Sequence, residues 1–377
     1  MKLQNCKSVL IVTASFSKAK LAESERVYYL VKSLLKHGVA VTVLTTKCKD
    51  NYKLKGDIIV VDSLPIPLLK FNLLNRIISP IADGLLPTYF MNKKKIISSV
   101  EQNYDFVISS SPPHSIHYLG LLLANKKNAP FMLDLRDAWK HNKLVKYGTF
   151  IHKFFSNLAY KSFLSQADVI IANTPQLKDL VSKDRFNCEV VSVPNGYPRE
   201  SFENITPILN SNNLKMLYSG GHYGEKAVNI ISKLLPKSSS YSVDFLGEPF
   251  TPAYGCNYIG KVSSQEVPLK LLSYDALIIY MPPEENGSAR VLLKAYGYAK
   301  SGKDIIYIGA KNATYDFLNF MSNIHYVEEN DLATFSEILA KLEVTRSQQG
   351  INKIDFSFES NFEKLIKREL CLKIKSY

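Results

Sequence analysis

The sequence predicts a mixed α/β protein of two domains, each built on a parallel β-sheet. The chain has 377 residues, which is more than one hydrophobic core usually organises. Short apolar runs alternate with segments of helical periodicity, a pattern typical of β-α-β units. A polar, aperiodic stretch at residues 198–213 separates two such sets.

The first set opens with a complete β-α-β unit. Ser8–Thr13 is a short apolar run, and Glu23–His37 places its apolar residues on one helical face. Gly38 is the expected helix stop before the next strand, Val39–Leu44. Such units form parallel sheets with right-handed crossovers. Further strands are predicted at residues 57–61, 106–108, 131–133, 169–172 and 190–193, and helices at 115–125 and after the capping pair Thr174-Pro175.

The second set repeats the alternation after the polar stretch. Strands are predicted at residues 215–218, 242–246, 276–280 and 304–309, and helices after Ser263, at 288–300, at 331–342 and from Phe358. We therefore expect two Rossmann-like domains that face each other across a cleft. Their expected bounds are 1–197 for the first domain, 198–213 for the linker, 214–355 for the second domain, and 356–377 for a terminal helix that could pack back on the first domain.

The composition narrows the possible partners. A formal net charge of +13 favours an anionic partner, such as a nucleotide, a nucleic acid or an acidic membrane surface. The basic residues are dispersed rather than clustered with aromatic residues, so no nucleic acid is expected. Five widely spaced cysteines without a C-x-x-C pair are expected to be reduced packing residues. No apolar run suits a signal peptide or approaches the roughly 20 residues of a membrane span, so a cytoplasmic location is expected.

One segment interrupts the α/β alternation. Leu64–Phe90 is rich in Leu, Ile, Pro and aromatic residues, and Lys93–Lys95 follows it. An apolar surface beside a lysine cluster suits an anionic membrane interface, which would place the protein peripherally on the inner face of the plasma membrane. A packed connection followed by a solvated helix start is the alternative.

The carboxyl ends of the predicted strands, beside the cleft, are where ligands of open α/β sheets bind. After the strand that ends at Tyr218, the turn 219–224 nearly matches G-x-G-x-x-G. Gly220 and Gly221 would let backbone N–H groups approach a phosphate, and Lys226 would add a cation. A tight turn without a ligand is the alternative.

A second candidate for donor binding lies at the helix predicted over 288–300. Ser288, Arg290 and Lys294 combine a hydroxyl group with two cations at a helix start, where a diphosphate could bind. The spacing of Arg290 and Lys294 puts them on one face of that helix. Solvated surface charges are the alternative.

Charged residues follow one apolar strand of the first half. Asp134-Leu135-Arg136-Asp137 lies at its carboxyl end, where charges are costly unless they are exposed or paired. Arg136 and Asp137 are therefore candidate catalytic residues. A structural Arg–Asp pair is the alternative.

The loop 109–114 follows a neighbouring strand and suits an acceptor site. It combines hydroxyl groups, a Pro-Pro turn and His114, which is a third catalytic candidate. A single histidine also often has a structural role. Ser111, and Arg26 on the first predicted helix, are the candidates for acceptor binding.

Several reaction classes have no motif in this sequence. Without a D-x-D pattern, a metal–nucleotide site held by carboxylates is not expected. The chain also lacks H-E-x-x-H, G-x-S-x-G and G-x-x-x-x-G-K-[ST], which argues against a metalloprotease, a serine hydrolase and a P-loop ATPase.

The motifs in their order and spacing resemble the retaining glycosyltransferases of family four, which have the GT-B fold and are common in bacterial capsule and O-antigen assembly. The resemblance covers nearly the whole chain. The segments that carry it are Ser110–Ser115, Leu133–Trp139, Ala167–Ala172, Val193–Gly196, Leu217–Gly220 and Lys294–Lys303.

The resemblance implies a nucleotide-sugar donor bound mainly by the second domain and a saccharide or polyprenyl-linked acceptor bound by the first. It implies no metal and no cofactor besides the nucleotide-sugar co-substrate. The turn at Gly220-Gly221 and Lys294 match the phosphate contacts of the family. Retention would follow from front-face attack with the departing phosphate as the base, so no protein nucleophile is expected.

The sequence departs from the family at four places. Gly297 stands where the family usually has a Glu that holds the donor ribose, and Asp304 stands where it usually has Pro. Residues 14–19 replace a glycine-rich loop, and Arg136 replaces a His of many members.

These departures leave alternatives open. A glycosyltransferase-like binding or scaffold subunit with a degenerate donor site is the main one, unless Glu284 or Glu285 supplies the missing carboxylate. A nicotinamide-dependent enzyme would need an acidic residue at the end of the next strand, and Asp244 falls in mid-strand instead. A nucleotide-sugar epimerase of the same fold would act without an acceptor.

Overall fold

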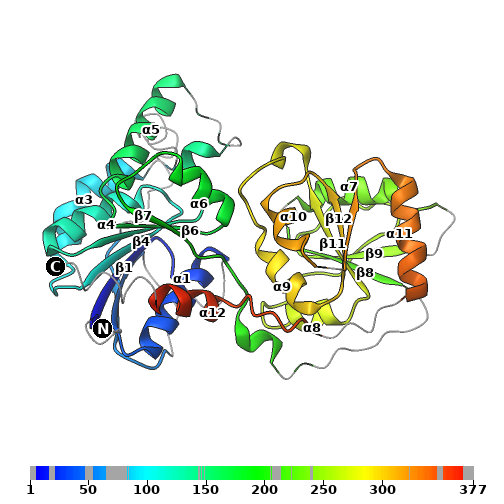
Figure 1. Ribbon diagram of the computed structural model, residues 1–377, viewed down its shortest axis with the longest axis horizontal. Coiled ribbons are helices and arrows are strands. Elements are labelled where there is room, and N and C mark those ends of the chain that lie inside the picture. The colour runs from blue at the N-terminus through cyan, green and yellow to red at the C-terminus, as the bar shows by residue number, and fades with distance from the viewer. Residues whose placement is uncertain are drawn as a thin grey trace. The chain divides into compact units, whose positions relative to one another are not determined.

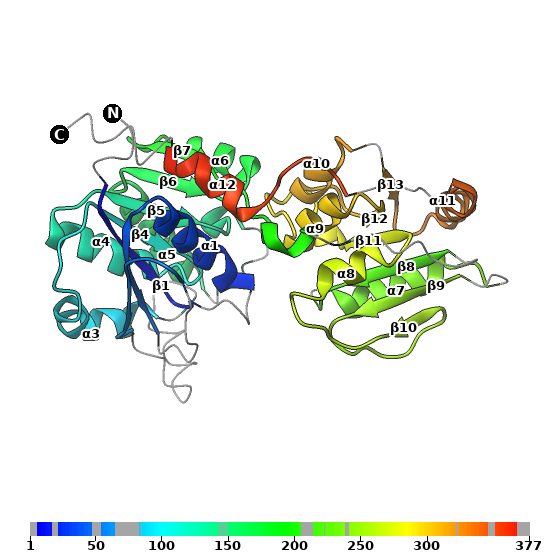
Figure 2. The ribbon, with the colours of Figure 1, turned by 90° about the horizontal axis from the view of Figure 1, so that it is seen from below.

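The computed structural model describes most of the chain. The described residues are 6–16, 22–46, 54–64, 83, 85–142, 145, 147, 149–203, 205, 214–221, 223–237, 241–321, 323–345 and 351–367. The chain divides into two compact units, the first comprising Met1–Asn195 with Phe358–Tyr377 and the second comprising Gly196–Ser357. Each unit carries one parallel sheet with helices on its faces, which confirms the predicted fold class (Figures 1 and 2).

The first unit is built on a seven-stranded sheet of order β3-β2-β1-β4-β5-β6-β7. Its strands are β1 (Ser8–Thr13), β2 (Ala40–Thr45), β3 (Ile58–Asp62), β4 (Phe106–Ser110), β5 (Phe131–Leu135), β6 (Val169–Ala172) and β7 (Glu189–Ser192). Its helices are α1 (Ala22–Lys36), α3 (Leu86–Ser98), α4 (Ile116–Lys127), η2 (Trp139–His141), α5 (Phe150–Leu164), α6 (Pro175–Ser182) and α12 (Phe358–Leu365). The strand order reverses between β1 and β4, and ligands of open α/β sheets bind beyond such a switch point.

The last helix, α12, belongs to the first unit and lies beside α1 (Figures 1 and 2). Phe358 stacks on Tyr29 with the ring centroids 5.3 Å apart. Lys36 of α1 pairs with Glu363 of α12 at 2.8 Å. The chain therefore leaves its first unit after Asn195 and returns to it at Phe358.

The second unit is built on a six-stranded sheet of order β10-β9-β8-β11-β12-β13. Its strands are β8 (Lys215–Ser219), β9 (Ser242–Leu246), β10 (Cys256–Tyr258), β11 (Ala276–Met281), β12 (Asp304–Gly309) and β13 (Ile324–Val327). Its helices are η3 (Arg199–Phe202), α7 (Gly224–Leu234), α8 (Val267–Leu272), η4 (Pro283–Glu285), α9 (Leu293–Ser301), α10 (Ala313–Leu318) and α11 (Leu332–Thr345). Here the switch point lies between β8 and β11.

Both faces of the second sheet are covered, because parallel crossovers place helices on each side. Leu217, Leu277 and Ile279 belong to the core on one face. Met216 and Ile278 alternate with them and belong to the core on the other face. This arrangement explains why the strands read as continuous apolar runs in the sequence.

The helix expected at 288–300 starts later than predicted, at Leu293. The hydroxyl of Thr314 accepts the N–H of Leu292 at 3.1 Å and donates to the carbonyl of Arg290 at 3.0 Å. These bonds satisfy the backbone in a non-helical path. Arg290 therefore precedes α9, and the prediction that it shares a helix face with Lys294 is wrong.

Several elements were not among the predicted ranges. They include α5, α7 and α10 and the strands β10 and β13, whereas a helix near α3 was only an alternative. β10 has only three residues, and two of them, Asn257 and Tyr258, are exposed, so it carries no periodic signal. α5 has apolar residues on two faces, which obscures the helical period.

The expected linker at 198–213 begins with an ordered segment. Phe202 of η3 packs on Tyr197, with the ring centroids 5.1 Å apart, in the core of the second unit. Outside the described residues lie 204 and 206–213 of this stretch, 65–82 and 84 of the segment proposed for the membrane, and 17–19 of the first loop. Among the described helices, none combines the length and the apolar character needed to cross a membrane.

Candidate functional site

A glycine turn follows β8 in the second unit and leads into the amino end of α7. Gly220 has a φ of 102°, which suits glycine, and its N–H donates to the carbonyl of Leu246 at 2.7 Å. Its N–H is therefore engaged, and Gly220 contributes to the shape of the turn. A Cβ at Gly221 would lie 2.7 Å from Cγ of Glu248, so a larger residue would displace that side chain. The amino end of the 11-residue helix α7 follows at Gly224, and such an end attracts anions.

Lys294 projects from the first turn of α9 to the carboxyl end of β8. Its Nζ donates to the carbonyl oxygen of Ser219 at 2.9 Å and lies 3.6 Å from the ring centroid of Tyr218. Burial alone lowers the pKa of Lys294 to about 7. Within the described part of the chain no carboxylate pairs with this ammonium group, so an anionic ligand would supply the missing countercharge.

Glu285 organises the second predicted loop. Its carboxylate is fully buried and accepts hydrogen bonds from Tyr223 at 2.5 Å, from Ser288 at 2.6 Å and from Arg290 at 3.2 Å. Ser288 and Arg290 are thus held by one carboxylate, and Tyr223 connects them to the start of α7. The side chain of Arg290 is 43% exposed, so its guanidinium group still faces solvent.

Lys226 has a different environment from Lys294. It forms an ion pair with Glu284, and both side chains lie at the surface. A cation that already has a carboxylate partner must exchange it to bind phosphate. Of the predicted donor contacts, Lys294 is therefore the better placed cation. Glu285 is buried and already holds Ser288 and Arg290, whereas Glu284 pairs with Lys226 at the surface.

Two residues at this turn were missed by the sequence analysis. Glu248 lies against Gly221 and pairs with Lys261 at 2.7 Å. The loops after β9 and β10 that carry them are joined by the bond from Gly247 N–H to the Gly260 carbonyl at 2.9 Å. A carboxylate just beyond the second strand is where Rossmann-like units hold ribose hydroxyls. The available sequence signal was a glycine followed by a charged residue after a strand, as in Gly247-Glu248 and Gly260-Lys261.

The structure shows the surroundings of Asp244 and Gly297, the two positions on which the alternative functions depend. Asp244 lies in mid-strand and accepts hydrogen bonds from Tyr274 at 2.7 Å and Asn257 at 3.1 Å, so it does not reach the turn as a nicotinamide enzyme would require. A Cβ at Gly297 would meet only Cδ1 of Leu271, at 3.4 Å. The position therefore has room for the start of a side chain.

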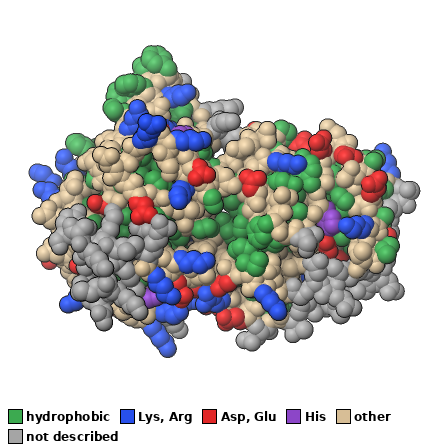
Figure 3. All heavy atoms as spheres, in the orientation of Figure 1, with side chains coloured by type: hydrophobic (Ala, Val, Ile, Leu, Met, Phe, Trp, Pro, Cys, Tyr) green, Lys and Arg blue, Asp and Glu red, His purple; other side chains and the backbone are tan. Residues whose placement is uncertain are grey.

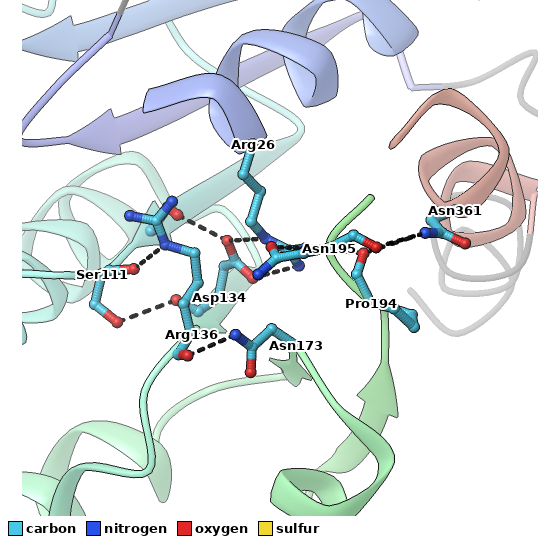
Figure 4. A network of polar contacts seen from close by, with 9 residues as sticks. Arg26, Ser111, Asp134, Arg136, Asn173, Pro194, Asn195 and Asn361 are labelled. Carbon is cyan, nitrogen blue, oxygen red and sulfur yellow. Dashed lines mark hydrogen bonds and ion pairs between the residues drawn. The ribbon is translucent and has the colours of Figure 1, made fainter. Parts of the chain in front are cut away.

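Arg26 and Asp134 form the centre of a buried network in the first unit (Figure 4). Nε and one terminal nitrogen of Arg26 donate to the two carboxylate oxygens of Asp134 at 3.1 and 2.9 Å. The other terminal nitrogen donates to the Pro194 carbonyl at 3.1 Å and to Asn195 Oδ1 at 3.2 Å. Asn361 of α12 also donates to the Asn195 carbonyl, at 3.0 Å.

This geometry corrects the expected role of Arg26. Its side chain is 1% exposed, so no acceptor reaches it in this structure. The residue instead ties α1 to the ends of β5 and β7 and, through the Asn195 loop, to α12. The sequence signal was a cation on an apolar helical face, which indicates burial with a partner rather than ligand contact.

Ser111 and Arg136 join the loops after β4 and β5 (Figure 4). The N–H and hydroxyl of Ser111 both donate to the Asp134 carbonyl, at 3.1 and 3.3 Å. Arg136 donates through Nε to the Ser111 carbonyl, and Asn173 donates to the Arg136 carbonyl at 2.6 Å. Ser111 is fully buried, so its hydroxyl shapes the loop rather than facing an acceptor.

His114 lies in an aromatic cluster under the same loops. Its ring stacks on Trp139 with the ring centroids 4.3 Å apart, and the ring centroid of His117 lies 6.0 Å from that of Trp139. Within the described structure, Nδ1 of His114 and Nε2 of His117 are buried without a hydrogen-bond partner. Burial lowers the pKa of both histidines, against the opposing charge of Asp137 at His114. Both rings are therefore neutral at pH 7.

The predicted residues thus form one cluster in each unit. In the first unit Ser111, Arg136 and His114 meet at the ends of β4 and β5, and Asp137 is exposed beside them. In the second unit Lys294 donates to the carbonyl of Ser219, where the turn that contains Gly221 begins. Among the described residues no group of three or more His, Cys, Asp or Glu side chains could hold a metal ion.

The similarity of the chain to known proteins agrees with this geometry. Residues 24–201 match the sequence profile described as Glycosyltransferase Family 4. No protein of curated function matches the sequence. Solved structures with the same fold include a sucrose-phosphate synthase from Thermosynechococcus elongatus, with a TM-score of 0.65 and 11% identity over 96% of this chain and 94% of that one.

Two further structures share the fold over nearly their whole length. A glycosyltransferase from Rickettsia africae has a TM-score of 0.59 and 14% identity, and covers 99% of this chain and 100% of its own. Anabaena HepE, solved in complex with UDP, has a TM-score of 0.57 and 10% identity over 95% of this chain and 94% of its own. Residues 24–201 are therefore similar to the glycosyltransferase family 4 domain, and the two Rossmann-like units have the GT-B fold of these structures.

Proposed function

We propose that the protein moves a sugar from a nucleoside diphosphate donor to a saccharide or polyprenyl-linked acceptor, with retention of configuration. The observation that carries the proposal is the Lys294 ammonium group beside the turn at Gly221. It is a cation without a carboxylate partner among the described residues, next to a turn in which Gly220 has a φ of 102° and which leads into the amino end of α7. A diphosphate matches this combination of charge and backbone geometry.

The donor would be held by the second unit. Gly221 would offer its N–H to the diphosphate, Lys294 its ammonium group and Arg290 its partly exposed guanidinium. Glu248 would accept hydrogen bonds from the ribose, in place of the carboxylate missing at Gly297. With the Lys294 cation and a helix end to balance the diphosphate, we propose that no metal or other cofactor takes part.

The acceptor would be bound at the loops after β4 and β5 of the first unit. Asp137 and Arg136 are the charged side chains that reach solvent there, and the neutral ring of His114 lies beside them. Front-face attack would use the departing phosphate as the base, so these residues would orient the acceptor hydroxyl. We further propose a role in capsule or O-antigen assembly at the inner face of the plasma membrane, which rests on the resemblance of the sequence motifs alone.

A second candidate function is a glycosyltransferase-like binding or scaffold subunit. Gly297 favours it, since the family carboxylate is missing there while the space for a side chain remains. Such a subunit would bind a nucleotide weakly and would not break the sugar–phosphate bond.

The deciding experiment combines binding with turnover, in the presence of a chelator. Thermal stability is measured with UDP, GDP, ADP, dTDP and CMP, because a ligand at about 100 times its Kd adds roughly 2.7 kcal/mol of stability. The responding nucleotide then selects the nucleotide sugars, and release of free nucleoside diphosphate is followed with and without a membrane extract. Release would support a transferase. Binding without release from any of these sugars would favour the scaffold subunit, and a requirement for a divalent cation would contradict the proposed metal independence.

A further inference from the structure

Helix α5 of the first unit has two apolar faces, and the protein covers only one. Tyr160, Phe163 and Leu164 are buried against the rest of the unit. The opposite face presents large apolar side chains at the spacing i, i+1, i+4, i+5 and i+8. They are Phe150, Ile151, Phe154, Phe155 and Leu158, with exposed fractions from 44% at Phe155 to 83% at Phe150. Folding alone does not account for five such residues on one helical face.

Helix α3 extends this apolar surface. Phe90 and Met91 are 54% and 82% exposed. Between α3, α4 and α5 lies an apolar groove of about 400 Å³, to which Phe90, Tyr118 and Leu158 contribute. The exposed residues of α5 and α3 and this groove form one continuous surface, which we call the α3–α5 surface. Figure 1 shows α5 projecting from the first unit, and Figure 3 shows hydrophobic side chains gathered at its tip with Lys and Arg side chains next to them.

The two sequence segments that contain α3 and α5 carry charges of one sign. The sequence has no Asp or Glu between residues 84 and 100 or between residues 138 and 167, the two segments that contain α3 and α5. Lys94 and Lys95 on α3 and Lys153 and Lys161 on α5 are exposed. Lys93 lies 4.1 Å above the ring of Phe90. Long lysine side chains let an apolar face enter a membrane while their ammonium groups stay at the headgroups.

We infer that the α3–α5 surface docks on an anionic lipid bilayer. Apolar side chains at the tip of a projecting helix, flanked by lysines without acidic residues, combine the two attractions that hold interfacial helices to acidic membranes. A protein partner or a second copy of this chain would cover the apolar residues equally well. A second copy does not explain why every charge in the two segments is positive, because an interface between copies would bring those lysines together. The inference does not depend on the proposed sugar transfer, and no donor or acceptor is needed to test it.

The test is flotation of the full chain with vesicles, one set of phosphatidylcholine alone and one of phosphatidylcholine with phosphatidylglycerol in equal parts. The wild type is expected to float with the anionic vesicles and far less with the neutral ones. The double variant Phe150→Ser with Phe154→Ser is expected to lower the partition coefficient at least about tenfold, since each phenylalanine buries a large apolar area in the interface. The double variant Lys94→Gln with Lys95→Gln is expected to lower it about fivefold for each lysine lost, and only with anionic vesicles.

Controls separate docking from general effects. Val344 is 86% exposed on α11 of the second unit, so Val344→Ser removes an exposed apolar side chain elsewhere and is expected to leave flotation unchanged. The exposed positions of the phenylalanines leave the melting temperature of the Ser variant within a few degrees of the wild type. Equal flotation of wild type and the Phe double variant would overturn the inference. So would concentration-dependent oligomers of the wild type that the Phe double variant abolishes, since the surface would then join two copies.

Discussion

The ammonium nitrogen of Lys294 lies 2.9 Å from the carbonyl oxygen of Ser219, the last residue of β8. This contact joins α9 to the strand end at which the glycine turn begins. It also holds the cation above the ring of Tyr218, away from any described carboxylate. The positive charge is thus kept at the switch point of the sheet, where a ligand would meet it.

Lys294→Met is expected to have opposite effects on stability and on binding. Replacing a buried cation by an apolar side chain of similar length should raise the melting temperature of the free protein. A hydrogen bond between charged groups contributes about 1.5–3 kcal/mol, so the affinity for the responding nucleoside diphosphate should fall roughly ten- to hundredfold. Lys226→Met is the matched control and should change the affinity less than about threefold, because Lys226 is paired with Glu284 at the surface. Equal losses in the two variants would contradict the distinction between these lysines.

The pH dependence of stability follows from the same residue. Burial lowers the pKa of Lys294 from 10.5 to about 7 in the folded protein. Between these values the unfolded chain binds more protons, so Lys294 makes stability rise with pH over this window. The destabilisation is fully present below pH 7 and vanishes as the pH approaches 10.5. The advantage of Lys294→Met over the wild type, measured by urea unfolding, should therefore shrink as the pH is raised from 7 toward 10. A constant advantage over this range would mean that Lys294 is not the titrating group.

Nucleotide binding should take up protons above pH 7. A diphosphate beside Lys294 favours its charged form, so binding raises a pKa that burial has lowered to about 7. Titration calorimetry at pH 8 in buffers of different ionisation enthalpy measures this uptake. We expect it in the wild type and in Lys226→Met but not in Lys294→Met. Binding without proton uptake in the wild type would place the diphosphate elsewhere.

Arg26→Met should destabilise the first unit without changing its acceptor affinity. Removing one partner of a buried ion pair leaves the Asp134 carboxylate uncompensated, which costs about 3–5 kcal/mol. The exposed pair of Lys36 with Glu363 gives the control, and Lys36→Met should cost less than about 1 kcal/mol. The KM for the acceptor, measured below the melting temperature of the variant, should match the wild type. A raised KM with unchanged stability would restore the acceptor-binding role that the structure argues against.

Glu248 and Gly297 give opposite predictions for ribose recognition. Glu248→Ala should weaken binding of the nucleoside diphosphate about tenfold or more and abolish its preference over the 2′-deoxy form. Glu337 on α11 is an exposed carboxylate far along the chain, and Glu337→Ala should leave both affinities unchanged. Gly297→Glu has room at Cβ and should not improve binding if Glu248 already holds the ribose. A large gain from Gly297→Glu, with no loss from Glu248→Ala, would favour the degenerate donor site.

The sequence was sufficient to predict the bounds of strands that are buried on both faces and of helices whose apolar residues recur at the helical period. β12 and β1 agree with their predicted bounds, because parallel strands covered on both faces read as unbroken apolar runs. The helix predicted from Glu23 agrees with α1, because its apolar residues form one stripe along the helix. The start of α9 was mispredicted because the hydroxyl of Thr314, distant in sequence, satisfies the backbone that a helix would otherwise use.

Part of the candidate site could likewise be predicted from the sequence, and part could not. Glycines after a strand identify a turn, so Gly220 and Gly221 could be found from the sequence alone. The sequence alone could not show which cation lies at that turn. Lys226, Arg290 and Lys294 differ in the partners that they contact in the folded protein. Glu284 and Glu285 take up the first two, and a backbone carbonyl holds the third.

By itself, the sequence determined that this chain forms two parallel α/β units and which strand ends carry polar loops, since periodicity and strand ends are local properties. Only the tertiary structure decided that Arg26 is buried with Asp134, that Lys294 has no described carboxylate beside it, and that one apolar face of α5 is left uncovered. Pairing and burial depend on contacts between residues far apart in the chain. Phe154 and Phe163 are alike as residues of one helix, and only the packing of the first unit leaves Phe154 at 63% exposure and Phe163 at 8%.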